Sequence, residues 1–171
     1  EEARGIMESA SQHDFLTGLP NRSKFMEDLE EAIRSETPFT IMMMDIDNFK
    51  TINDTFGHTA GDDALKQLAA RLKEIHSQIF TSYRFAGDEF IVILKSKSGK
   101  IVDKAAHQCR QMFDKPFVLD GEKRKVGGSI GIASYPQDAG TVEQLIICAD
   151  AAMYEVKKNG KNNFAYYHKV E

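Results

Sequence analysis

Four segments of the chain place an apolar residue at every third or fourth position, which gives each of them one hydrophobic face. This spacing predicts amphipathic helices around residues 25–33, 62–76, 100–113 and 142–156. Gly160 stands just after the last segment, where glycine commonly ends a helix because it tolerates positive φ. These helices form the first half of the predicted fold.

Shorter runs between the helices have the apolar, β-branched and aromatic composition of strands. They are predicted at residues 39–46, 79–85, 90–94, 117–118, 125–135 and 164–167. A turn sequence, Ala-Gly-Asp-Glu at residues 86–89, separates the second run from the third and predicts a hairpin. Helices alternate with strands on either side of it, so we predict an α+β fold in which helices cover one mixed sheet.

The composition is that of one soluble globular domain with a sizeable core. The chain has 171 residues, of which 42% are hydrophobic and 28% charged, and its formal net charge is −4. This acidic balance argues against nucleic acid as a partner, because binding its backbone requires clustered positive charge. Cys109 and Cys148 are too few and too far apart for a disulfide scaffold or a Cys-x-x-Cys metal site, so we expect buried free thiols.

The sequence contains neither a signal peptide nor an apolar run of about 20 residues, the length of a membrane span. Because the chain starts with Glu1 and not with Met, we expect it to be a piece of a longer protein. The expected location of this piece is the cytoplasm, and the longer protein can still be membrane-anchored.

Two carboxylates, Asp45 and Asp47, stand at the end of the first predicted strand, where a period of two places them on one face. Burying two like charges is costly without a cation, so a divalent metal explains the pair economically. Solvated aspartates at a strand end are the alternative without a function. A phosphatase with an Asp-x-Asp motif is a third hypothesis, but residues 48–50 (Asn-Phe-Lys) differ from the usual continuation in such enzymes.

A second acidic pair, Asp88 and Glu89, follows Gly87 at the tip of the predicted hairpin. Charged residues in a turn are usually solvated. If the hairpin lies beside the first strand, however, Asp88 can face Asp45. Two carboxylates from neighbouring strands are the protein ligands that a two-metal phosphoryl-transfer site requires.

Residues 53–62 are polar and read as a loop between a strand and a helix, with an N-cap at Gly61 or Asp62. The functional alternative is recognition of a base, because Asn53 offers a donor and an acceptor and ionised Asp62 accepts two donors, which suits guanine. His58 is expected to be a structural hydrogen-bonding residue. Cationic side chains at 157 and 161 near a helix end are favourable by themselves, and a triphosphate nearby would add a binding role.

Several segments in this order resemble the GGDEF family of diguanylate cyclases. They are residues 14–22 (DFLTGLPNR), 45–50 (DIDNFK), 53–54 (ND), 56–58 (FGH), 61–62 (GD), 84–90 (RFAGDEF), 129–133 (SIGIA) and 149–162 (ADAAMYEVKKNGKN). Each segment alone is a weak signal, and the ordered set is very specific. The resemblance covers residues 14–167, nearly the whole chain.

The resemblance implies an adenylyl-cyclase-like, palm-like (ferredoxin-like) fold, that is, a mostly antiparallel central sheet surrounded by helices. It implies an enzyme that condenses two GTP molecules into cyclic di-GMP, a bacterial second messenger, and releases pyrophosphate. By motif position, Asp45 and Asp88 would bind two Mg²⁺ or Mn²⁺ ions with help from the Ile46 carbonyl, and Glu89 would assist there. Asn53 and Asp62 would hold the guanine. The β- and γ-phosphates are assigned to the backbone of Phe49 and Lys50 and to the side chains of Lys157 and Lys161.

The resemblance also implies partners and a domain organisation. Residues 1–13 would be a linker or helix tail from a preceding domain, 14–168 the GGDEF domain, and 169–171 the start of a following linker. Catalysis would need a transient dimer with a second GGDEF domain. A sensor domain is expected before this one, and an EAL phosphodiesterase domain is suggested after it. The alternative function is a silent GTP-binding module that regulates an attached domain.

Three departures from the family pattern are visible. The signature loop reads Ala86, Gly87, Asp88, Glu89 and Phe90, with alanine in place of the first glycine. We expect reduced activity, and a further strain cost if this position needs positive φ. Lysine at 161 replaces an arginine, which keeps the charge and loses bidentate geometry. Residues 77–80 (Ser-Gln-Ile-Phe) lack the Arg and Asp of the family's inhibitory product site, so we expect no such site.

Overall fold

The central sheet is built around a strand that is buried along its whole length. In the part of the chain that the structure describes, the sheet has five strands in the order β2-β3-β1-β6-β7. The central strand β1 (Phe39–Ile46) pairs antiparallel with β3 (Glu89–Leu94) and with β6 (Gly128–Tyr135). Strand β2 (Phe80–Ala86) completes the hairpin with β3, and β7 (Asn163–Tyr166) runs parallel to β6.

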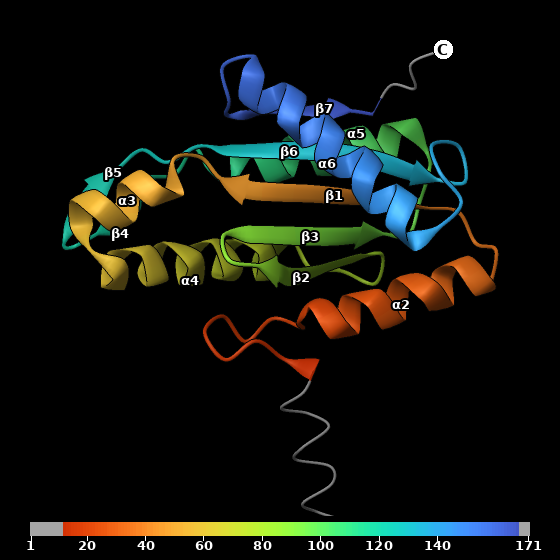
Figure 1. Cartoon of the computed structure of the whole chain (residues 1–171), viewed down its shortest axis with the longest axis horizontal. Helices are drawn as coiled ribbons and strands as arrows, with labels where there is room; N and C mark the ends of the chain where they lie inside the picture. The colour runs from red at the N-terminus through yellow and green to blue at the C-terminus, as the bar shows by residue number, and fades with distance from the viewer. Residues whose placement is uncertain (1–11, 168–171) are drawn as a thin grey trace, which may run out of the picture.

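Helices cover both faces of this sheet in the structure, a computed structural model that describes residues 12–167 (Figure 1). On one face lie α2 (Arg22–Arg34) and α6 (Val142–Lys158), and on the other lie α4 (His58–Ile75) and α5 (Gly99–Gln111). None of the helices within the described residues is long and apolar enough to cross a membrane.

The alternation of side chains along β1 explains why its sequence is largely apolar. Met42, Met44 and Ile46 pack into the core under α4 and α5, whereas Ile41 and Met43 pack under α2 and α6. A strand covered on both faces needs apolar residues at every position. Asp45, the penultimate residue of β1, and Asp47, the first residue after it, therefore lie at the edge of two hydrophobic cores.

One end of the sheet carries the remaining short elements. Helix α3 (Phe49–Phe56) follows β1 directly, and the small hairpin of β4 (Phe117–Leu119) and β5 (Glu122–Arg124) lies near it, at the left in Figure 1. Asp120 and Gly121 form the turn of this hairpin with φ of 51° and 78°. Strand β1 points toward this end, so its last residues meet α3 there.

The predicted helices and strands are present, and the central mixed sheet is mostly antiparallel as expected. The strand predicted at 125–135 is shorter, since β6 begins at Gly128, and β4 pairs with the unpredicted β5 in a separate two-stranded sheet. The loop prediction is also wrong: residues 53–62 are not a loop, and the N-cap is neither Gly61 nor Asp62. They belong to α3 and α4, which Gly57 separates with a φ of 94° that only glycine adopts readily. Helix α3 has eight residues and is rich in Asn, Asp and Thr, so packing against α4 stabilises it where local propensity does not.

The ends of the chain fall largely outside the described residues. The linker expected at residues 1–13 is described only at Gln12 and His13, and the linker expected at 169–171 is not described. The described chain begins with a closed turn in which His13 forms a bridge with Pro20. Asn21 then caps α2 by accepting a hydrogen bond from the Lys24 amide, as the sequence predicted.

Candidate active site

Three acidic residues occupy neighbouring backbone positions where β1 ends beside the β2–β3 hairpin. Glu89 is the direct antiparallel partner of Asp45 in the sheet, and Asp88 lies in the hairpin turn just before it. Gly87 closes the turn with a φ of 41°. The hairpin therefore does lie beside the first strand, as the hypothesis for Asp88 required.

Asp45 is the most unusual of these groups because it is charged, buried and incompletely paired. Only 6% of the residue is exposed. Its Oδ2 accepts a hydrogen bond from Lys157 Nζ at 2.5 Å, whereas its Oδ1 is buried without a hydrogen-bond partner among the described residues. Burial raises the pKa of Asp45 to about 6, although the Lys157 ammonium opposes this and Asp88 adds to it. Lys157 therefore compensates the negative charge of the Asp45 carboxylate through only one of its two oxygens.

Neighbouring groups show the same excess of negative charge. Burial raises the pKa of Glu89, and the carboxylates of Asp150 and Asp88 raise it further. Burial by itself lowers the pKa of Lys157, but its hydrogen bond to Asp45 outweighs burial and the net pKa is raised. The Lys157 ammonium thus faces several carboxylates at this end of the sheet, and Arg22 is a further cation that acts on Glu89.

The donors at this site fit a hard divalent cation. An orphaned carboxylate oxygen beside two further carboxylates supplies the oxygen ligands that Mg²⁺ or Mn²⁺ prefers. No group of three or more His, Cys, Asp and Glu side chains within residues 12–167 is arranged to hold a metal by itself. Mg²⁺ is commonly bound by one or two carboxylates and completed by substrate phosphates and water, so a site with few protein ligands remains consistent.

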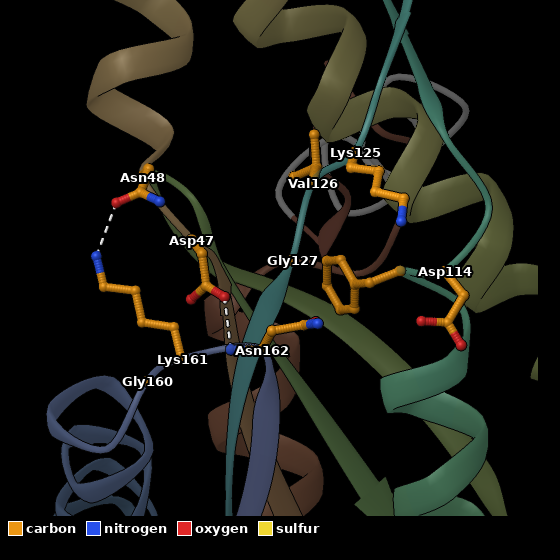
Figure 2. Close-up of a pocket in the computed structure, with 10 residues that line it drawn as sticks. Asp47, Asn48, Asp114, Lys125, Val126, Gly127, Gly160, Lys161 and Asn162 are labelled. Atoms are coloured by element: carbon orange, nitrogen blue, oxygen red, sulfur yellow. Dashed lines mark hydrogen bonds between the residues drawn. The ribbon is translucent and has the colours of Figure 1, made fainter.

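Asp47 has a different environment from Asp45, although the sequence pattern treats them alike. Ser129 Oγ donates to its Oδ1 at 2.6 Å, and the Asn162 backbone N–H donates to its Oδ2 at 2.8 Å. Figure 2 shows the second of these contacts. Both oxygens are satisfied within the protein, so Asp47 ties β1 to β6 and to the segment that follows α6.

A cavity of about 430 Å³ adjoins Asp47 (Figure 2). It is lined by Asp47, Asn48, Phe113, Asp114, Lys125, Val126, Gly127, Gly160, Lys161 and Asn162. Asp45 and Asp88 are not among these residues. Of the residues singled out in the sequence analysis, Asp47 and Lys161 line this cavity, and Lys161 Nζ donates to Asn48 Oδ1 at 2.7 Å.

The two residues predicted to recognise guanine lie where α3 and α4 cross. The Asn53 Oδ1 lies 1.9 Å from the point that a Cβ of Gly61 would occupy, so the carboxamide rests directly on that glycine. Asp62 is the next residue of α4 and is exposed. The structure thus brings the Asn53 carboxamide to the residue adjacent to Asp62, on a surface that solvent can reach.

The residues predicted to bind phosphate are divided between two places. Phe49 and Lys50 are the first residues of α3, where backbone N–H groups lack helical partners and favour an anion. Lys161 reaches the N-cap residue of that helix, Asn48. Lys157 instead pairs with Asp45. Both lysines therefore already donate to a side chain of the protein, Lys157 to Asp45 and Lys161 to Asn48.

Arg84 links the turn of the β2–β3 hairpin to Asp14 near the start of the described chain, a role that the sequence analysis did not predict. Its Nε and Nη2 donate to the Gly87 carbonyl at 3.1 and 2.8 Å, and its Nη1 pairs with the Asp14 carboxylate at 3.1 Å. Asp14 also accepts hydrogen bonds from the backbone N–H and Oγ1 of Thr17. The only available signal was that both charged residues fall within segments of the family resemblance.

The backbone of Ala86 does not adopt the positive φ that glycine tolerates and that would strain an alanine. It is the last residue of β2, after an irregularity in the β2–β3 register between Arg84 and Ala86. Among the described residues of this hairpin, positive φ falls on Gly87 and not on Ala86. The backbone therefore accepts alanine here without a left-handed penalty.

Comparison with known proteins defines the class. The family model described as "Diguanylate cyclase, GGDEF domain" matches residues 11–163. The chain therefore belongs to the GGDEF family.

Relatives and solved structures agree with this assignment. Diguanylate cyclase A of Treponema denticola is 40% identical over 158 residues, covering 87% of this chain and 42% of that protein. The bifunctional diguanylate cyclase/cyclic di-GMP phosphodiesterase MucR of Pseudomonas aeruginosa is 34% identical over 159 residues, covering 91% and 23%. The solved GGDEF domain of TpbB (YfiN) from Pseudomonas aeruginosa has a TM-score of 0.86 at 34% identity, covering 91% and 94%. The palm-like cyclase fold is thus confirmed.

The chain spans about half or less of the curated relatives it matches, from 20% to 52% of their lengths. Activities named for whole relatives therefore describe larger molecules than this one.

Proposed function

We propose that this domain condenses two GTP molecules into cyclic di-GMP and two pyrophosphates. The observation that carries the proposal is the buried Oδ1 of Asp45, which has no hydrogen-bond partner among the described residues, in a carboxylate that pairs with Lys157 and is repelled by Asp88. A buried, partly unpaired carboxylate beside the β2–β3 hairpin, which carries the family's signature loop, would be stabilised by a bound cation. The named cyclases among the relatives support the same chemistry.

In the proposed mechanism, Asp45 and Asp88 would hold two Mg²⁺ or Mn²⁺ ions, and the carbonyl of Ile46 would be a further ligand. Such ions supply a lowered pKa at the ribose 3′-OH and charge stabilisation at the pyrophosphate leaving group. Glu89 orients its neighbours from the facing strand. The 3′-oxygen forms a bond to the α-phosphorus as the bond to pyrophosphate breaks, and the hydroxyl proton passes to solvent.

The remaining residues position GTP. Asp62 accepts hydrogen bonds from the guanine N1–H and the exocyclic amine, and Asn53 pairs with the same base. The β- and γ-phosphates bind the backbone N–H groups of Phe49 and Lys50 and the ammoniums of Lys157 and Lys161.

One domain holds one GTP in this scheme, so turnover needs two domains that present their 3′-hydroxyls to each other's α-phosphorus. The rate should therefore rise with the square of the domain concentration while dimers are scarce. A preceding sensor domain, a following EAL domain and membrane anchoring of a longer protein belong to the same proposal. Feedback through an inhibitory product site is not part of it, because residues 77–80 lack the required Arg and Asp.

A silent GTP-binding module is the second candidate. Ala86 in the signature favours it, as does 31% identity to the Pseudomonas aeruginosa protein named cyclic di-GMP phosphodiesterase NbdA. In that case the domain binds GTP and regulates an attached domain without turnover.

Nucleotide chromatography distinguishes the candidates. The purified chain is incubated at high concentration with GTP and Mg²⁺ or Mn²⁺, beside an Asp88→Asn control. A cyclic di-GMP peak that the control lacks supports the cyclase. Intact GTP that nevertheless binds supports the silent module. Release of GDP or inorganic phosphate would contradict both and revive the phosphatase hypothesis.

A further inference from the structure

Gly61 of α4 packs directly against residues of α3. It is buried, and a Cβ added there would lie 1.9 Å from Asn53 Oδ1, 3.0 Å from Asn53 Cγ and 3.3 Å from Phe49 Cζ. Its φ is not in the positive region that favours glycine. Lack of space, and not backbone conformation, is therefore what excludes a side chain at this position.

A glycine inside a helix is locally unfavourable, because alanine has the higher helix propensity. Gly61 lies in the first turns of the 18-residue helix α4, so local preference favours alanine there. The contact with Asn53 explains the exception. The bare Cα of Gly61 forms a notch that receives the Asn53 carboxamide.

This notch also sets where the carboxamide lies relative to Asp62, the next residue of α4. We propose that Gly61 is a specificity-determining positioning residue, which holds the Asn53 carboxamide beside the Asp62 carboxylate so that both address one purine. The inference rests on the proposed guanine-binding function and adds the residue that aligns its two polar groups. Gly61 acts through Asn53 and does not itself contact the base.

The structure indicates that Gly61→Ala changes the site more than the fold. The atom that a methyl would meet first is the far end of the Asn53 side chain, which can rotate away. The helix itself tolerates alanine. The variant should therefore fold while its carboxamide leaves the notch, and the preference for GTP over ATP should fall.

The experiment measures binding of non-hydrolysable GTP and ATP analogues by titration calorimetry with Mg²⁺. Gly61→Ala should lower the GTP-to-ATP preference at least tenfold, in the direction of Asp62→Ala. Gly99→Ala is the matched control, since Gly99 is also helical and a Cβ there would meet open space. In an Asn53→Ala background, Gly61→Ala should lower the GTP-to-ATP preference by less than a further twofold. The reason is that the Asn53 carboxamide, which the new methyl would displace, is already absent.

Several results would overturn the inference. The first is a GTP-to-ATP preference in Gly61→Ala that equals that of the wild type. The second is a loss of this preference on adding Gly61→Ala that is as large in the Asn53→Ala background as in the wild type. The third is a wild-type chain that does not prefer GTP over ATP. Absence of cyclic di-GMP with an intact binding preference would instead defeat only the cyclase proposal. Should Gly61→Ala fail to fold, restored folding in the Asn53→Ala double variant would support the contact, and continued unfolding would refute it.

Discussion

Asp45 and Asp47 stand two residues apart at the end of the same strand, and their surroundings are opposite. Asp47 has both carboxylate oxygens paired, with Ser129 Oγ and with the Asn162 amide. Asp45 has one oxygen on Lys157 and one buried oxygen without a hydrogen-bond partner in the described part of the chain. Both are nearly excluded from solvent, with 6% and 8% exposed for Asp45 and Asp47 respectively.

The difference separates a carboxylate that the protein satisfies from one that it leaves partly unsatisfied, which under the proposed function is a metal ligand. A buried polar group that the protein satisfies contributes to stability, whereas an unsatisfied one costs free energy. Such a cost is typical of positions selected for binding or catalysis. The comparison therefore predicts that changes at Asp45 alter activity first, and changes at Asp47 alter stability first.

The largest expected effect is loss of turnover in Asp45→Asn. The amide keeps the shape of the side chain and removes the charge that a divalent cation needs, so cyclic di-GMP formation should fall by about 10³-fold. Asp47→Asn is the matched comparison, and its rate per folded molecule should fall less than about tenfold. Chromatographic rate assays on both variants make the test, and equal losses would erase the distinction between the two residues.

Next in size is the loss of stability in Asp47→Ala. Removing the carboxylate leaves the Ser129 hydroxyl and the Asn162 amide unpaired, so the free energy of unfolding should fall by about 2–4 kcal/mol. Urea denaturation followed by circular dichroism measures this change. Ser129→Ala removes one of the two contacts and should cost about 1 kcal/mol. Wild-type stability in Asp47→Ala would show that the paired carboxylate is not a structural tie.

The next smaller effect is a pH dependence of the free energy of unfolding that comes from Asp45. Burial raises its pKa in the folded state from 3.8 to about 6, so the folded state binds this proton more tightly than the unfolded state. The contribution of Asp45 to stability is therefore full below about pH 4 and is lost as the pH rises through 6. Asp45→Asn does not titrate, so without metal it should exceed the wild type by up to about 3 kcal/mol at pH 7.5.

Thermal unfolding of both proteins between pH 4 and 8 measures that difference, which should shrink as the pH falls. Adding Mn²⁺ should stabilise the wild type and leave Asp45→Asn unchanged, since only a ligand bound to the folded state shifts unfolding. A stability gap that stays constant with pH would contradict the raised pKa.

The smallest effect is expected at Ala86, which is neither an unsatisfied carboxylate like Asp45 nor a paired one like Asp47. Its backbone is not left-handed, so Ala86→Gly relieves no strain and should lower stability by about 0.5–1 kcal/mol through added chain freedom. Turnover should change less than about threefold, a difference of under about 1 kcal/mol in barrier. Gly87→Ala, at a φ of 41°, is the contrasting variant and should be the more damaging one. A large gain of activity in Ala86→Gly would mean that the methyl itself obstructs substrate.

The element pattern of this fold was predictable because it depends on local periodicity. The buried run of β1 and the apolar stripes of the long helices are visible in the sequence. Helix α3 was missed because its residues are poor helix formers that packing against α4 holds in place. The motif residues at the site could likewise be identified from their order along the chain.

The sequence by itself determined which carboxylates, amides and lysines the protein possesses and where the strand that carries Asp45 and Asp47 would end. Only the tertiary structure decided which of the two aspartates is satisfied. The partners of Asp47 lie 82 and 115 residues farther along the chain, and Lys157 reaches Asp45 across 112 residues. Hydrogen bonding and burial depend on such distant contacts, so two aspartates equivalent in the sequence pattern acquire different chemistry once the chain has folded.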